Sequence, residues 1–286
     1  MRKTIVPVAL AVLAGGWVAA VNAADAPVGT QRPKILVINR EMVKPGRQPA
    51  HEKNEALWPA ALRRANSKGI YVALSSGDEA WFLSPFASFA AMEAQGKEDD
   101  ANATLGAELD RLWASDGDML AGATSLTAIY DEDLSYRTDW DVAKLRYYAI
   151  NVTRLQPGYS HDFETLRKLI KAAHEKAKVE ERWSVYEVVA GAPDDTYIMM
   201  FPIVSLAEWD KYEEMHGKAF QDALGDDTRG RLREFEKAAV KMSETKLFRI
   251  MPKMSYLPKE FTDRDPDFWT PKPAAPAAAK KEEKKP

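Results

Sequence analysis

The sequence predicts an α+β protein made of two tandem β-α-β-β-α-β units, whose antiparallel sheets pack together as an α/β barrel within one chain. Two observations support this prediction. Short sequence matches recur in the same order about 112–121 residues apart, and the order of strand-like and helix-like segments repeats with the same spacing. A duplicated unit of this length lies within the usual size range of a protein domain.

The clearest match aligns Asn39 with Asn151, 112 residues later, and each stretch ends in a Pro-Gly pair. The other matches are 117 to 121 residues apart, a drift that loop insertions produce. They pair Ser88 with Ser205, Gln95 with His216, and Leu134 with Met254. Chance explains any one match, but four in the same order indicate a duplication.

The first unit opens with a β-rich stretch that ends at a Pro-Gly turn, and a helix follows in which Leu57, Ala61 and Leu62 share one stripe. A turn at residues 76–79 predicts a hairpin. In order, we expect strand Lys34–Val43, helix Pro49–Ala65, strands Ile70–Ser75 and Ala80–Phe86, a helical region from Ser88 to about Ala121, and strand Ala123–Tyr130.

The second unit repeats this order. We expect strand Lys144–Leu155, helix Ser160–Lys178, strands Arg182–Val189 and Thr196–Ile203, helices from Ser205 to about Lys241, and strand Lys246–Met251. A unit of this kind forms a four-stranded antiparallel sheet with both helices on one face, so its other face needs cover. Two copies in one chain can cover each other.

The N-terminal residues 1–23 have the pattern of a secretory signal. Arg2 and Lys3 precede the apolar run Ile5–Ala20, and Val21-Asn22-Ala23 offers a small-x-small cleavage site. The run is shorter than the ~20 apolar residues that a membrane span needs. We therefore expect a cleaved signal and no transmembrane segment after its removal, with an uncleaved anchor as the alternative. Export of a chain without cysteine favours a bacterial periplasmic or secreted location.

The expected organisation has two units with short connections. It comprises a signal peptide (1–23), an N-terminal linker (24–33), the first unit (34–136), a linker (137–143), the second unit (144–256), a C-terminal extension (257–270) and a disordered Pro/Ala/Lys tail (271–286). The tail has no large apolar residue, so it cannot bury enough surface to offset its ordering entropy.

Composition excludes several classes of function. The chain has no cysteine and four histidines, which excludes disulfide scaffolds, thiol catalysis and Cys-ligated clusters and predicts no metal centre. Residues 24–270 contain 33 basic and 41 acidic residues, a net charge of −8. This balance disfavours nucleic acid as a partner and favours a small-molecule ligand or a protein.

The element order, the Pro-Gly exit from the first strand and the internal repeat together resemble the dimeric α/β-barrel superfamily in its fused, single-chain form with two ferredoxin-like repeats. The resemblance spans about Lys34–Met251 and implies a monomer that acts as a pseudo-dimer. Two separate domains without a shared barrel are the structural alternative.

Asn39 and Asn151 occupy the same place in the two units, in the middle of a strand. Asn is unfavourable in strands, so it is either a polar anchor, in a pocket or in the barrel interior, or a structural amide that satisfies the backbone. Monooxygenases of the superfamily use a first-strand Asn, and the haem-degrading ones add a helix His as iron ligand. Asn151 with His216 is similar to that pair. The resemblance implies haem as the candidate cofactor, although Met200-Phe201-Pro202 stands where those enzymes carry a Trp.

Aromatic residues cluster on the expected strands, more densely in the second unit. They either line a cavity for a flat or apolar ligand or form ordinary core. The predicted ligand-binding residues are Asn151, Tyr148, Trp183, Tyr186, Tyr197, His216, Asn39 and Trp81. The remaining histidines, His51, His161 and His174, are expected at the solvated surface.

The sequence thus favours an exported small-molecule-binding protein whose ligand is apolar or aromatic. One alternative is a monooxygenase, with or without haem, that uses the second-unit pocket. The other is a non-catalytic structural or partner-binding protein whose cavities are filled core. The residues do not decide whether the protein is an enzyme.

Overall fold

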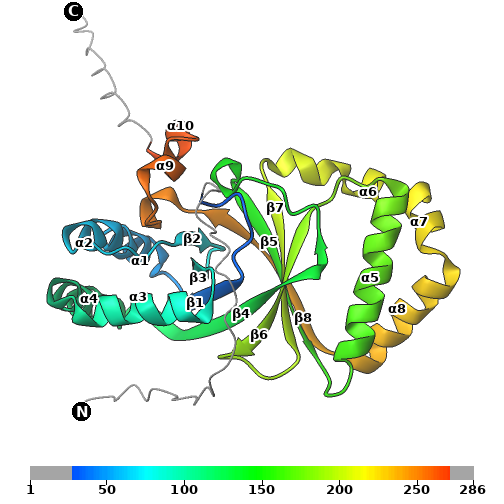
Figure 1. The fold of residues 1–286 in the computed structure, drawn as a ribbon, viewed down its shortest axis with the longest axis horizontal. Coiled ribbons are helices and arrows are strands. Elements are labelled where there is room, and N and C mark those ends of the chain that lie inside the picture. The colour runs from blue at the N-terminus through cyan, green and yellow to red at the C-terminus, as the bar shows by residue number, and fades with distance from the viewer. Residues whose placement is uncertain (1–27, 271–286) are drawn as a thin grey trace, which may run out of the picture.

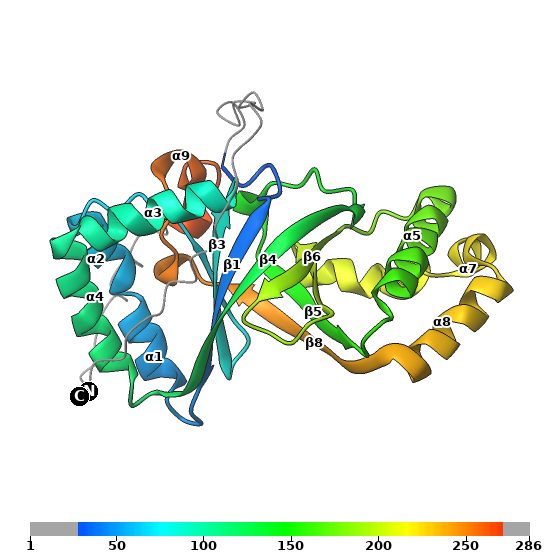
Figure 2. The same cartoon turned by 60° about the horizontal axis from the view of Figure 1, so that its bottom comes forward.

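The computed structural model describes residues 28–270, apart from the side chains of Tyr212 and Glu213. The segments predicted as signal peptide and C-terminal tail lie outside the described residues. Eight strands form one closed antiparallel barrel in the order β1-β3-β2-β8-β5-β7-β6-β4. Figures 1 and 2 show α1–α4 on one side of this barrel and α5–α8 on the opposite side.

The elements follow the predicted order along the chain. The strands are β1 (Ile35–Val43), β2 (Val72–Ser75), β3 (Glu79–Phe86), β4 (Leu120–Tyr136), β5 (Tyr147–Leu155), β6 (Trp183–Ala190), β7 (Thr196–Ile203) and β8 (Val240–Ile250). The α-helices are α1 (Gln48–Glu55), α2 (Trp58–Arg64), α3 (Phe89–Ala101), α4 (Ala103–Asp116), α5 (Ser160–Ala177), α6 (Tyr212–Met215), α7 (Lys218–Leu224), α8 (Asp226–Ala239), α9 (Lys259–Thr262) and α10 (Pro266–Trp269). Short 3₁₀ segments are η2 (Val142–Lys144), η3 (Leu206–Lys211) and η4 (Pro252–Met254).

The strand pairing is similar in the two halves. The first half runs β4-β1-β3-β2 and the second runs β8-β5-β7-β6, and the pairs β2–β8 and β4–β6 join them. Asn39 lies opposite Phe82 and Ser125, and Asn151 lies opposite Met199 and Thr245. The closed barrel fits the dimeric α/β-barrel fold, so this part of the prediction is confirmed. The alternative of two separate domains is wrong, because all eight strands share one sheet.

The main hydrophobic core fills the barrel interior. Strand alternation turns Leu36 and Ile38 of β1, and Ile150 and Val152 of β5, into this core. The interleaved residues, Asn39 and Asn151 among them, therefore face the helices. The barrel-interior position that the sequence left open for the two asparagines is excluded.

Two strands are longer than the sequence predicts. β4 covers residues 120–136 where 123–130 was expected, and β8 covers 240–250 where 246–251 was expected. Each pairs with strands of both halves, β4 with β1 and β6, and β8 with β5 and β2. Pairing with distant segments extends both strands into polar residues, and the local sequence of these residues does not predict a strand.

Three of the four predicted helical regions are divided, whereas the helix expected at Ser160–Lys178 is the single helix α5. The expected helix Pro49–Ala65 is two helices, α1 and α2, with Pro59 in the first turn of α2. The region after Ser88 divides at Asn102, whose side chain accepts a hydrogen bond from the Leu105 N–H and so caps α4. The region after Ser205 divides into η3, α6, α7 and α8.

Two histidines expected at the surface are buried, which corrects the prediction. His51 is 1% exposed and His174 is 2% exposed. A buried imidazole needs a polar partner, and each has a carboxylate: Glu41 lies 2.7 Å from His51, and Glu181 lies 2.9 Å from His174. His161, by contrast, is exposed as predicted.

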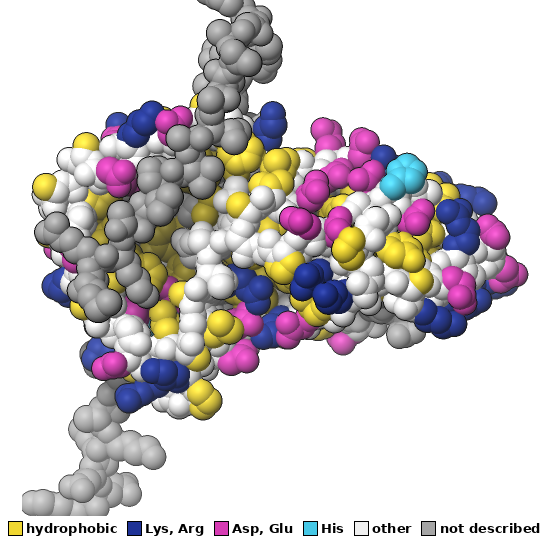
Figure 3. Space-filling view, turned by 90° about the horizontal axis from the view of Figure 1, so that it is seen from below, with side chains coloured by type: hydrophobic (Ala, Val, Ile, Leu, Met, Phe, Trp, Pro, Cys, Tyr) yellow, Lys and Arg dark blue, Asp and Glu magenta, His cyan; other side chains and the backbone are white. Residues whose placement is uncertain are grey.

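The surface of the barrel protein is mixed in charge. Figure 3 shows acidic and basic side chains interspersed over the part of the molecule that carries α5–α8. Within residues 28–270, no helix combines the length and the apolar character that crossing a bilayer requires.

Substitution of neighbouring β1 residues tests which side of the strand faces the core. Ile38→Ala should lower the free energy of unfolding by about 2–5 kcal/mol, because Ile38 is fully buried in the barrel interior. Asn39→Ala should change it by less than about 0.5 kcal/mol, because Asn39 is exposed. Urea unfolding measures both. Equal losses in the two variants would contradict the assigned faces.

Candidate functional site

A cavity of about 430 Å³ opens at the end of the barrel where β1 and β5 begin. Its walls are mainly apolar and come from strands of both halves and from the C-terminal extension. They include Leu36, Val72, Leu83, Met200, Leu257 and Phe261. The volume lies within the range of small-molecule sites, which are typically apolar and contain a few polar groups.

Arg32 brings a positive charge to this cavity. Its Nη2 donates hydrogen bonds to the carbonyls of Gly29 and Trp140, both at 3.0 Å, and its guanidinium lies 4.2 Å from the centre of the Trp140 ring. Its Nε is buried and has no hydrogen-bond partner among the described residues. A fixed guanidinium with an unused donor suits an anionic or carbonyl group of a ligand.

Tyr148 and Tyr186 supply hydroxyl groups to the same cavity. Burial raises the pKa of both phenols, although the charge of Arg32 opposes this effect. Both tyrosines therefore stay neutral at physiological pH and can donate or accept hydrogen bonds. Ser184 adds a third hydroxyl to the lining.

The cavity is bordered by two segments from opposite ends of the described chain. Arg264 donates a hydrogen bond to the carbonyl of Val28, and Trp269 Nε1 donates to the carbonyl of Ala143 at 2.8 Å. Gly29 has a φ of +85°, and a Cβ there would lie 2.6 Å from the Phe261 ring. Glycine is thus required for this close approach.

Among the predicted ligand-binding residues, Tyr148 and Tyr186 line the cavity. Trp81 lies in the barrel core, 5.0 Å from the Phe248 ring, and its Nε1 donates to Glu79 at 2.7 Å. Trp183 and Tyr197 belong to a second buried cluster between the sheet and α5. These last three residues are thus packed as core.

Asn151 uses its amide to join two strands. Its Nδ2 donates to the hydroxyls of Ser243 (3.0 Å) and Thr245 (2.9 Å) on β8, and its Oδ1 accepts from Thr153 at 2.7 Å. The amide hydrogens are therefore occupied within the sheet. Asn39 is exposed on the matching face of β1. Neither asparagine lines the barrel-end cavity.

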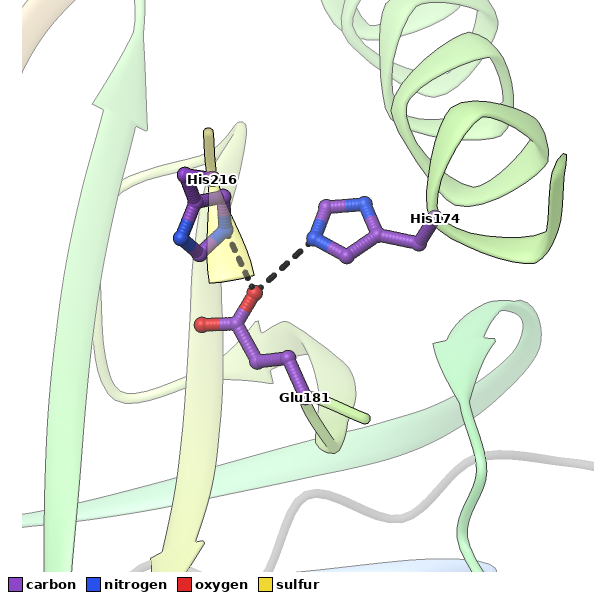
Figure 4. Close-up of side chains that lie close together, drawn as sticks. All are labelled: His174, Glu181 and His216. Atoms are coloured by element: carbon purple, nitrogen blue, oxygen red, sulfur yellow. Dashed lines mark hydrogen bonds and ion pairs between the residues drawn. The ribbon is translucent and has the colours of Figure 1, made fainter. Parts of the chain in front are cut away.

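His216 belongs to a compact polar cluster with His174 and Glu181 (Figure 4). Glu181 Oε2 lies 2.9 Å from His174 Nε2 and 3.2 Å from His216 Nε2. His174 Nδ1 is also 2.8 Å from the carbonyl of Ile170, which only accepts. His174 thus has a hydrogen-bond acceptor at each ring nitrogen.

The charge of Glu181 is stabilised by this cluster. Burial raises the pKa of its carboxyl, but hydrogen bonds to His174 and His216 outweigh that effect and hold the pKa at about 2. Burial lowers the pKa of the nearby Arg167 guanidinium to about 10, although the negative charge of Glu181 opposes this effect. The carboxylate of Glu181 therefore has two imidazoles and a guanidinium around it. The cluster connects α5, the loop before β6 and the turn before α7.

This arrangement does not fit haem binding through His216 Nε2. An axial ligand needs an open apolar slot in front of the coordinating nitrogen, whereas His216 Nε2 faces Glu181 and the His174 ring lies 5.5 Å from the His216 ring. The amide of Asn151, in turn, hydrogen-bonds across the sheet to Ser243 and Thr245 on β8. The structure therefore does not bring the haem-type pair suggested by resemblance into a common pocket.

Sequence reasoning missed Arg32 and Glu181. Arg32 falls in residues 24–33, which were assigned to a linker, and its place before the first strand is the only local signal. Its role depends on the closing of one barrel end by distant segments. Glu181 lies seven residues after His174 but in the loop beyond the end of α5, so the helical pattern of α5 does not indicate that the two side chains meet.

No model of a known protein family matches the chain, and no curated protein matches it. Solved structures do match the chain. An anthrone oxidase-like protein is 14% identical, with a TM-score of 0.50, over 78% of this chain and 94% of its own. A candidate monooxygenase from Fusobacterium nucleatum is 8% identical, with a TM-score of 0.49, over 77% of this chain and 93% of its own. A candidate chlorite dismutase is 15% identical, with a TM-score of 0.44, over 78% and 96%.

At 14% identity, the likeness to the anthrone oxidase-like protein shows the fold alone. It agrees with the closed barrel of eight antiparallel strands, which fits the dimeric α/β-barrel fold.

Acid titration tests the Glu181 cluster. The folded-state pKa of Glu181 lies below its ordinary value of 4.5, so its contribution to stability is present above pH 4.5 and is lost as the pH falls toward 2. Glu181→Gln should lower the free energy of unfolding by roughly 2–4 kcal/mol at pH 7, and this difference from the wild type should shrink below pH 4.5.

Glu180→Gln is the matched control, because Glu180 is exposed and adjacent in sequence. It should change stability by less than about 0.5 kcal/mol at either pH. Thermal or urea unfolding from pH 7 to pH 2.5 measures all three proteins. A constant difference between the wild type and Glu181→Gln across this range would show that the carboxylate charge is not the cause.

Proposed function

We propose that the protein binds a small apolar or aromatic molecule in the cavity at the end of the barrel. The observation that carries this proposal is the volume of about 430 Å³, enclosed by apolar side chains from both halves. A packed barrel of this size normally fills its interior with side chains. A space large enough for a bicyclic aromatic molecule, at one end only, favours a ligand.

The polar groups of the cavity narrow the class of ligand. Arg32 supplies a positive charge held in place by two carbonyls, and Tyr148 and Tyr186 supply neutral hydroxyls. A flat or apolar body with one carboxylate, phenolate or carbonyl group complements this set. The apolar walls would exclude water around such a group and so strengthen its interaction with the guanidinium.

The proposal also covers the evolutionary origin of the chain and the cellular location of the protein. The two ferredoxin-like repeats descend from a duplicated unit, an interpretation supported by the equivalent places of Asn39 on β1 and Asn151 on β5. A monomer then acts as its own pseudo-dimer. The signal-like residues 1–23 support an exported, periplasmic or secreted protein, in which the ligand is collected outside the cytoplasm.

Calorimetric titration of the full chain with two probes tests this function. We expect 2-naphthoate to bind one site, and Arg32→Gln to weaken it by about tenfold, because a charge-assisted hydrogen bond is lost. The affinity for the neutral probe 2-naphthol should change by less than about threefold in the same variant. Ser184→Trp, which fills the cavity, should abolish binding of both probes.

Arg32→Lys and Arg231→Gln are the controls. The first retains the charge and should recover part of the affinity for 2-naphthoate, and the second removes an exposed arginine on α8 and should leave it unchanged. Circular dichroism checks that each variant is folded. Absence of binding to the wild type, or binding that Ser184→Trp leaves intact, would overturn the assignment of the cavity.

A further inference from the structure

Four ionisable side chains meet beneath the first group of helices, and none of them lines the barrel-end cavity. Glu41 is on β1, His51 and Glu55 are on α1, and Asp116 is the last residue of α4. Their exposures are 3%, 1%, 3% and 0%. They form a separate site, which we call the Glu41 cluster.

Three members of the Glu41 cluster bring their ligating atoms together. His51 Nε2 lies 2.7 Å from Glu41 Oε2, and one ligating atom from each of Glu41, His51 and Glu55 lies within 4.8 Å of the other two. His51 and Glu55 are four residues apart on α1, which puts them on the same face of the helix. β1 supplies Glu41 because alternation turns it, like Asn39, toward the helices.

Asp116 is the second observation that points to a ligand. It is fully buried, and neither of its carboxylate oxygens has a hydrogen-bond partner in the described part of the chain. It faces Glu55, whose Oε1 likewise lacks a partner there. Asp116 also ends α4, where the negative end of the helix dipole disfavours a carboxylate. In the described part of the chain, Asp116 contacts the carboxyl of Glu55, an acidic group rather than a cation.

The charge balance of the Glu41 cluster differs from that of the Glu181 cluster. Three carboxylates face a single imidazole, and no Lys or Arg of residues 28–270 forms an ion pair with Glu41, Glu55 or Asp116. Buried carboxylates are tolerated when they are protonated, paired or bound to a metal.

We propose that Glu41, His51 and Glu55 bind one divalent transition-metal cation, with Asp116 next to Glu55 behind these ligands. A dication would offset the negative charge of the buried carboxylates and supply a partner for Glu55 Oε1. It would also connect β1 and α1, and so fasten the helix layer of the first half to the barrel. The burial of all three ligands places the ion out of reach of a substrate.

The donor set selects among cations. An imidazole together with carboxylates suits Mn²⁺, Fe²⁺ or Zn²⁺, whereas Mg²⁺ and Ca²⁺ prefer oxygen ligands alone. We therefore expect Mn²⁺ or Zn²⁺ to bind the chelator-treated protein at one equivalent per chain, and Mg²⁺ to bind much more weakly. Co²⁺ in place of the native ion should give a visible absorption band.

Metal analysis of four variants of the full chain tests the proposal. Each protein is stripped with a chelator, reloaded with Mn²⁺ or Zn²⁺, desalted and measured by elemental mass spectrometry and by thermal unfolding. The wild type should retain one ion and gain thermal stability on loading. Glu55→Gln and Asp116→Asn should bind the ion at least about tenfold more weakly and lose the metal-dependent rise in Tm.

The two control variants carry the same kinds of substitution elsewhere. Asp118→Asn removes an exposed carboxylate two residues after Asp116, and Glu181→Gln alters the other His-carboxylate cluster. Both should retain one ion per chain. Glu55→Gln and Asp116→Asn remove buried charge, so the metal-free variants should unfold at or above the Tm of the metal-free wild type.

Two results would overturn the proposal. One is a wild type that binds no Mn²⁺ or Zn²⁺ and whose Tm is unaffected by chelator, which would mean that shared protons alone neutralise the Glu41 cluster. The other is an ion lost from Glu181→Gln and retained by Asp116→Asn, which would place it at the Glu181 cluster. The Co²⁺ absorption of the wild type gives a readout that does not depend on the folding of any variant.

Discussion

Closure of the sheet is the constraint on which the rest of the structure depends. Each half alone would leave strand edges with unpaired backbone groups, an arrangement that promotes association with other chains. The pairs β2–β8 and β4–β6 remove these edges, and they require β4 and β8 to be long enough to reach both halves. Closure also separates two environments, an apolar interior and a polar layer between the sheet and the helices. The cavity lies in the first environment, and both buried charge clusters lie in the second.

Local sequence patterns predicted the features that depend on nearby residues. These features are the order of strands and helices along the chain, the Pro-Gly exits, and the alternation that places Asn39 and Asn151 on one face. The lengths of β4 and β8 could not be predicted in this way, because Ser243 and Thr245 belong to a strand only through their contact with Asn151 across the sheet. The sequence also did not determine which aromatic side chains line the cavity. Tyr148, Tyr186 and Trp81 all belong to the barrel core, but only the two tyrosines lie at the end of the barrel where the cavity opens.

The two histidines that were expected at the surface show a limit of a different kind. His51 and His174 each lie in a helix among polar residues, a composition typical of a solvated face. Both are buried because a carboxylate from another segment meets the imidazole, Glu41 from β1 and Glu181 from a loop. Pairs of this kind leave no periodic signature. The Glu181 cluster and the Glu41 cluster then differ in charge balance. A guanidinium and a second imidazole accompany Glu181, whereas further carboxylates surround His51.

The contact between Val28–Gly29 and Phe261–Arg264 has a practical consequence for work with this protein. Residues 28 and 29 form part of the cavity wall, and Phe261 of the C-terminal extension packs on Gly29. A shortened chain that begins after Gly29 would therefore lose part of this wall and the hydrogen bond from Arg264 to Val28. An insertion in the exposed turn between β6 and β7, at residues 191–194, keeps foreign sequence away from the opening.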